Sequence, residues 1–175
     1  MPIIVAGLGE PDENRSNVAP STKGCVASFI DEGKRVGVIV ELHCESDFVA
    51  RSDEFRKLAE DLARHIGELS PRFIYKEEVP RDVVAKEREL LRAEAIAVGQ
   101  SGRELEEYVE SKLAGFYTAA CLMEQRFVRN REFSVGEMIA RIGVELAVSI
   151  KVHRYVRFEL GGKEVRQSQA ARKSG

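Results

Sequence analysis

The residues best suited to chemistry lie together near position 45, where His43, Cys44, Glu45 and Asp47 combine an imidazole, a thiol and two carboxylates. Converging side chains of these types could support nucleophilic catalysis or hold a metal ion. However, the preceding residues are apolar at every second position, which predicts a strand with one fully apolar face. On a strand, His43 and Glu45 point to one face and Cys44 to the other. The three therefore cannot all meet one substrate atom or ion, and we expect Cys44 to be a small, unreactive hydrophobe.

Known catalytic and cofactor motifs are missing from the sequence. It has no Walker phosphate loop, no HExxH and no GxSxG, and the GLG at residues 7–9 lacks the third glycine and following helix of a dinucleotide loop. Cys25, Cys44 and Cys121 are far apart and form no CxxC pair, so neither a disulfide framework nor a zinc finger is indicated. We expect a binding protein without a cofactor. A thiol enzyme that uses Cys44 or Cys121 is the weakest alternative.

Composition and charge narrow the class of partner. The net charge of −2 gives no general attraction for nucleic acid, so we expect no direct nucleic-acid binding. The longest apolar run is far shorter than a membrane span, and the first residues lack the basic region and apolar length of a signal peptide. These features predict a location in the cytoplasm or an organelle matrix, with no membrane partner.

Residues 36–55 contain the elements that position the chemical residues. We expect a strand over residues 35–44, a tight polar and aromatic corner at residues 46–49, and a helix over residues 52–69. Ser52 has the hydroxyl of a helix N-cap. Phe48 lies where the burial pattern of the strand stops, and two interpretations remain open. It either inserts into a partner or covers the core of its own chain.

Two further strands are expected. Residues 24–31 precede a turn at residues 31–34, in which Gly33 is free to take a positive φ, and this hairpin makes the first two strands antiparallel. A last strand covers residues 150–160. Strict alternation along it places Ile150, Val152, Val156, Phe158 and Leu160 on one face and Lys151, His153, Tyr155, Arg157 and Glu159 on the other.

The remaining pattern is helical. Pro80 can begin a helix that Gly99 ends, and Ser101 with Glu104 has the form of a capping box for the next helix, so the two form a helical hairpin. We predict an α+β fold in which helices cover a small three-stranded antiparallel sheet and the hairpin separates strands two and three. The predicted organisation is a flexible segment over residues 1–22, a core domain over 23–162 and a disordered basic tail over 163–175.

Several motifs in the sequence resemble those of the elongation factor Ts family. Residues 45–51, ESDFVAR, followed by Phe55, resemble the family signature ETDFVARNxxF, with Ser46 in place of Thr and His43 in place of an Asn. Residues 62–66 (LARHI), 122–128 (LMEQRFV) and 155–161 (YVRFELG) resemble further family motifs in the same order and spacing. The resemblance covers roughly residues 23–161.

This resemblance implies a nucleotide exchange factor for the GTPase elongation factor Tu. The family inserts the signature corner beside the nucleotide, so Phe48 would act as a wedge and Asp47 would make polar contacts. The partner-binding residues that the resemblance indicates are Ser46, Asp47, Phe48, Val49, Arg51 and His65. From its place in the helix, His65 also fits a histidine at the edge of the core, and that interpretation stays open.

The most important departure from the family leaves alternatives open. The family normally begins with a three-helix domain, which residues 1–22 cannot form. That difference implies either a lower affinity or a divergent, organellar or truncated form. The rival function is a GTPase- or ribosome-binding module that does not promote exchange. The resemblance to family members with a single core implies a dimer, so a homodimer formed through the sheet also stays open.

Overall fold

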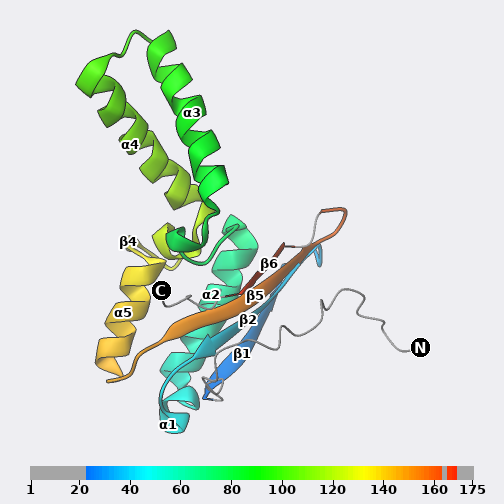
Figure 1. The fold of residues 1–175 in the computed structure, drawn as a ribbon. Coiled ribbons are helices and arrows are strands. Elements are labelled where there is room, and N and C mark those ends of the chain that lie inside the picture. Colours follow the sequence, from blue (N-terminus) through cyan, green and yellow to red (C-terminus); the bar gives the residue numbers. More distant parts are fainter. Residues whose placement is uncertain (1–22, 163–164, 169–175) are drawn as a thin grey trace, which may run out of the picture.

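The computed structural model describes residues 23–162 and 165–168 (Figure 1). The elements follow in the order β1 (Gly24–Ile30), β2 (Val36–His43), α1 (Asp47–Ala50), α2 (Asp53–Leu69), η1 (Lys76–Glu78), α3 (Arg81–Ala97), α4 (Gly102–Ala120), η2 (Leu122–Glu124), β3 (Arg126–Phe127), β4 (Asn130–Ser134), α5 (Val135–Glu145), β5 (Lys151–Glu159) and β6 (Val165–Ser168). None of the helices in these residues is long and apolar enough to cross a membrane.

The main sheet contains β1, β2, β5 and β6 in that order, and every neighbouring pair is antiparallel. The α+β class, the three predicted strands and the hairpin between the second and third strands are confirmed. The prediction of a disordered tail is wrong for residues 165–168, which form β6. Gly161, with φ of 78°, and Gly162 reverse the chain, so these residues can pair with the edge of β5. Residues 1–22 and the rest of the predicted tail lie outside the described residues.

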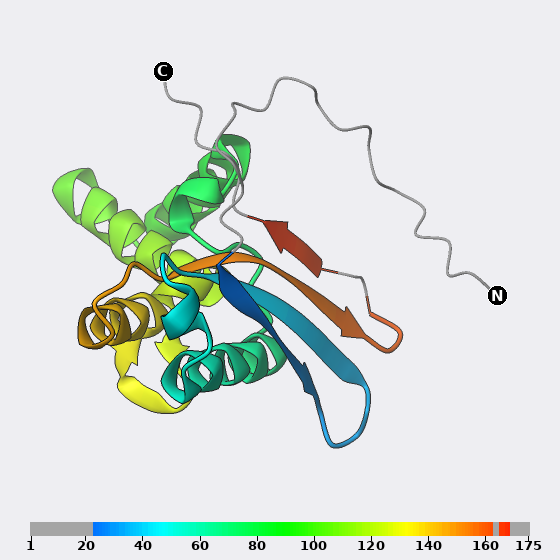
Figure 2. The ribbon, with the colours of Figure 1, turned by 90° about the horizontal axis from the view of Figure 1, so that it is seen from below.

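The core forms between the sheet and α2, which lies along one face of β1 and β2 (Figure 2). The inward face of β2 is the predicted apolar one, with Val38, Val40 and Leu42 buried. They pack in one cluster with α2 residues such as Phe55 and Leu62. Each large apolar side chain buried in this way contributes about 1.5–3 kcal/mol to folding, so the period-two strand and the helical stripe together stabilise this layer.

β5 departs from the predicted alternation because it contains a bulge. Glu41 pairs with Arg154 but the next residue of β2, Leu42, pairs with Val152, so His153 is an extra residue on β5. One extra residue turns every later side chain to the opposite face. Tyr155 and Arg157 are therefore buried, while Phe158 is 51% exposed. The predicted faces are wrong beyond the bulge.

The buried polar residues of β5 find partners in the chain. The Tyr155 hydroxyl donates a hydrogen bond of 2.6 Å to the carbonyl of Pro71. Two guanidinium nitrogens of Arg157 donate to the carbonyl of Gly67, at 3.4 and 3.3 Å. Burial without such bonds would cost about 1–3 kcal/mol per group, so these contacts permit the inverted face.

The first hairpin turn also differs in detail. Lys34, with φ of 52°, takes the left-handed conformation that was expected at Gly33. The Asp31 carboxylate accepts backbone hydrogen bonds from Gly33, Arg35 and Val36, and these bonds hold its pKa below the ordinary value. The aspartate therefore stabilises this turn by accepting hydrogen bonds from backbone N–H groups of the residues that follow it.

Helices α3 and α4, here called the arm, form an antiparallel pair that projects from the rest of the chain (Figure 1). Leu91, Val109 and Leu113 form a buried cluster within it that is separate from the main core. Gly99, with φ of 87°, follows α3 as predicted. The predicted capping box is wrong, because Ser101 is the N-cap of α4 but its side chain makes no capping hydrogen bond.

Candidate partner-binding site

Residues 46–49, here called the corner, form most of the single helical turn α1 and its N-cap. The Ser46 hydroxyl accepts a hydrogen bond from the backbone N–H of Val49 at 3.4 Å. At the other end, the Ser52 hydroxyl donates to the Val49 carbonyl at 2.8 Å and accepts from the Phe55 N–H at 3.3 Å. Two serine hydroxyls therefore hold a turn that is too short to be stable by itself.

The turn has one buried side and one exposed side. Val49 and Ala50 are buried and belong to the main core. On the other side, Asp47, Phe48 and Arg51 are exposed, and Phe48 is 87% exposed. At this exposure the Phe48 ring does not cover the core of its own chain, and its insertion into a partner stays a prediction. The structure presents an apolar ring to solvent on a braced backbone.

The predicted site residues therefore fall into distinct positions. Ser46 caps the turn and Val49 anchors it, while Asp47, Phe48 and Arg51 form its outer surface. The backbone N–H of Arg51 donates to the Phe48 carbonyl at 3.2 Å, which closes the turn. Of these five residues, the three exposed ones are available for contact with a partner.

His65 is not part of that surface, so its inclusion among the partner-contacting residues is corrected. Its side chain is fully buried in α2. Nε2 lies 2.9 Å from Oε1 of Gln125, and Nδ1 lies 3.3 Å from the backbone nitrogen of Val128. Because the Val128 N–H must donate, Nδ1 accepts and Nε2–H donates to Gln125.

The surroundings of His65 favour the neutral ring. Burial lowers its pKa below the ordinary value, and the hydrogen bond with Gln125 opposes this only in part. The imidazole thus joins α2 to residues on both sides of β3, Gln125 before it and Val128 after it. Gln125 was missed as a member of this pair. The signal that could have found it is the need of a buried helical histidine for a polar partner.

The thiols of Cys44 and Cys121 lie in the interior. The Cys44 thiol is buried and donates to the Ser46 carbonyl at 3.2 Å, so it braces the start of the corner. Burial, with nearby glutamates, raises the pKa of Cys121 to about 12. A nucleophilic cysteine needs accessible thiolate near neutral pH. Neither position offers that environment.

Comparison with known proteins identifies extensive sequence similarity. A family model described as Elongation factor TS matches residues 5–162. Elongation factor Ts of Carboxydothermus hydrogenoformans is 40% identical over 155 residues, which are 89% of this chain and 70% of that protein. The protein of the same name from Koribacter versatilis is 40% identical over 171 residues, covering 97% and 78%. That of Fervidobacterium nodosum is 37% identical over 139 residues, covering 79% and 71%.

Proposed function

Because this chain belongs to the elongation factor Ts family and is a translation elongation factor, we propose that it binds elongation factor Tu and promotes release of GDP. The observation that carries the proposal is the ring of Phe48, which is 87% exposed on a braced turn within the signature. The exposed surface of Asp47, Phe48 and Arg51 would be the part that enters the GTPase beside its nucleotide. Such a factor works where ribosomes are, in the cytoplasm or an organelle matrix.

The energetics of a single inserted ring suit this role. Moving the Phe48 side chain from water into an apolar pocket yields about 2–3 kcal/mol. Because the serines already fix the turn, little of that gain is lost in ordering it on binding. The resulting stabilisation of a conformation that holds GDP weakly would be enough to speed release, while other contacts supply affinity.

Exchange of this kind needs no reactive side chain on the factor. Linkage makes the effect reciprocal, so a factor that weakens GDP binding is itself displaced when GDP or GTP binds. A protein whose Cys44 and Cys121 are buried and whose exposed corner carries one aromatic ring fits a binding role of this type better than covalent chemistry.

The test is release of fluorescent GDP from elongation factor Tu at physiological Mg²⁺, with increasing amounts of this protein. We expect release to accelerate with protein concentration. Phe48→Ala should reduce the acceleration about 30- to 150-fold, the equivalent of the lost burial. Val144→Ala is the matched control, because Val144 is an equally exposed apolar residue on α5, 82% exposed.

Each outcome of this experiment has a meaning. Acceleration that disappears only in Phe48→Ala supports the proposed role. Binding without acceleration would favour the module that does not promote exchange. Acceleration that survives in Phe48→Ala would show that the corner is not the wedge.

We also propose self-association through the outer face of the main sheet. On that face Ile39 lies between Ser28 and Val156 in the ladder, and Gly37 lies between Ile30 and Phe158. Ile30, Ile39 and Phe158 are all exposed large apolar residues, and neighbouring apolar residues on one sheet face are typical of an interface.

Sedimentation equilibrium of the full chain tests this second proposal. We expect a dimer that Ile39→Asp converts to a monomer with unchanged circular dichroism, because the charge would be buried in the interface. Val144→Asp, on an exposed position of α5, serves as the control. A monomeric wild-type protein would contradict the proposal.

A further inference from the structure

A cluster of three potential ligands lies on the outer face of the sheet, apart from the corner. Glu41 and His43 are two residues apart on β2 and share that face. His153 reaches them from β5, where it is the extra residue of the bulge. One ligand atom from each of the three lies within 4.8 Å of the others. Because of the bulge, the side chain of His153 lies beside those of Glu41 and His43.

The contacts within the cluster are close and partly shielded from solvent. His43 Nε2 lies 2.6 Å from Glu41 Oε1, and the two side chains are 16% and 23% exposed. The rings of His43 and His153 stack with centroids 4.3 Å apart and planes 14° from parallel. This arrangement brings two nitrogen donors and one carboxylate together, and each of the three residues is half-buried.

We propose that Glu41, His43 and His153 form a binding site for a divalent transition-metal ion, with Zn²⁺ as the ion best matched to the donors. Imidazole nitrogen with one carboxylate suits Zn²⁺, whereas Ca²⁺ and Mg²⁺ prefer oxygen ligands alone. Three protein ligands leave the fourth tetrahedral position to water. This donor set does not depend on the proposed exchange activity.

A neighbouring arginine orients the carboxylate. Arg154 Nε donates to Glu41 Oε2 at 2.5 Å, so the other oxygen, Oε1, faces His43. Hydrogen bonds from outside the ligand set commonly fix ligands in this way. The positive charge of Arg154 also opposes a cation, so the site should bind less tightly than one without such a neighbour.

Binding requires one local movement. The lone pair of an imidazole lies in the ring plane, so two nearly parallel stacked rings cannot both point at one ion. One ring must turn out of the stack as the ion binds. The bound ion would then join the end of β2, three residues before Ser46, to β5.

Zn²⁺ titration of the full-length protein, followed by calorimetry and by the histidine ring signals in NMR, tests the proposal. We expect saturable one-to-one binding, with changes in the rings of His43 and His153 and none in buried His65. His43→Asn and His153→Asn should each weaken binding at least about 10-fold, the effect expected for disturbing a metal site. Circular dichroism verifies that each variant is folded.

Two controls make the experiment decisive. Cys25→Ser removes the cysteine that is only half-buried and should leave binding unchanged, while Mg²⁺ should not compete with Zn²⁺. The proposal is overturned if the wild-type protein shows no saturable binding, or if the double variant His43→Asn, His153→Asn binds Zn²⁺ as tightly as the wild type. GDP release measured at physiological Mg²⁺, with and without added Zn²⁺, keeps this result separate from the exchange proposal.

Discussion

The corner and the arm project from opposite ends of the molecule, and they are held in different ways (Figure 1). The corner is one helical turn, yet Val49 and Ala50 belong to the main core and two serine hydroxyls close its ends. The arm is far larger, with helices of 17 and 19 residues, but its buried cluster is separate and small. The larger of the two regions therefore shares less of its buried surface with the main core.

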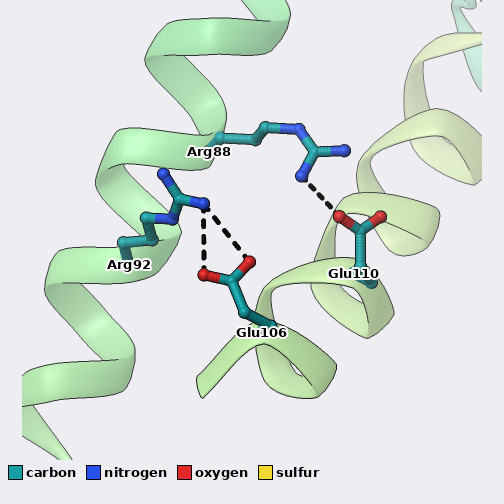
Figure 3. Close-up of polar contacts among 4 residues, drawn as sticks. All are labelled: Arg88, Arg92, Glu106 and Glu110. Carbon is teal, nitrogen blue, oxygen red and sulfur yellow. Dashed lines mark hydrogen bonds and ion pairs between the residues drawn. The ribbon is translucent and has the colours of Figure 1, made fainter. Parts of the chain in front are cut away.

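The two regions also differ in their polar contacts, which are exposed ion pairs in the arm and hydrogen bonds to the backbone in the corner. In the arm, Arg88 pairs with Glu110, and Arg92 Nη2 lies 3.1 and 3.2 Å from the two carboxylate oxygens of Glu106 (Figure 3). These pairs are solvent-exposed, and each contributes little because water screens it. The corner instead uses hydrogen bonds between serine hydroxyls and backbone groups close by in the sequence. From this comparison we expect the corner to hold Phe48 in a fixed position. We expect the arm to be the region that unfolds locally.

Leu113→Ala gives the largest expected change in stability and tests this difference directly. Leu113 is buried in the arm cluster, so its truncation should cost about 2–4 kcal/mol. Because that cluster is separate from the main core, we expect the cost to fall on the arm alone. Hydrogen exchange should become faster in α3 and α4 while the buried amides of α2 stay unchanged.

Leu90→Ala is the matched control, since Leu90 is on the same arm but exposed. It should leave exchange in both helices close to that of the wild type. Equal acceleration in α2 and the arm of Leu113→Ala would show that the protein unfolds as one cooperative unit, and the proposed contrast between the regions would fail.

Ser52→Ala should produce a smaller effect at the corner. It removes both the α2 cap and the hydrogen bond to the Val49 carbonyl, which should cost about 1 kcal/mol of unfolding free energy. It should also lower the acceleration of GDP release severalfold, because Phe48 would be less firmly positioned. Denaturant unfolding and the GDP assay measure the two effects.

The chain offers a suitable control for this variant. Ser101 is also an N-cap, of α4, but its side chain makes no capping bond. Ser101→Ala should therefore change stability by much less than Ser52→Ala. Equal losses from both variants would mean that helix propensity, rather than the hydroxyl contacts, explains the result.

The sequence predicted the layer formed by β2 and α2 because both obey simple periods. Val38, Val40 and Leu42 alternate, and Ser52 precedes a helical stripe, so local pattern and tertiary packing agree. The faces of the β5 residues that follow His153 could not be predicted in this way. A bulge at His153 depends on how β5 pairs with β2, and that pairing is not visible in the alternation of one strand.

The candidate site shows the same division. The signature indicated where the corner lies, but the sequence alone did not show whether the Phe48 ring is exposed. It also did not show that His65 is buried. Burial depends on contacts between distant segments, and for His65 these are Gln125 and Val128, about 60 residues away. The signature predicts where a site lies, whereas packing between distant segments decides which side chains are exposed.

Arg92→Ala should have the smallest effect, and it sharpens the interpretation of the arm. Both partners of the Arg92–Glu106 pair are about half exposed, so we expect a loss below about 0.5 kcal/mol that shrinks further in high salt. A double-mutant cycle with Glu106→Ala isolates the pair, and unfolding of the arm, followed by hydrogen exchange, is the measurement. A coupling above about 1 kcal/mol would place this pair beyond the range of ordinary surface pairs. The arm would then be held by its charged surface as much as by Leu91, Val109 and Leu113, and its salt sensitivity rather than its apolar cluster would decide when it opens.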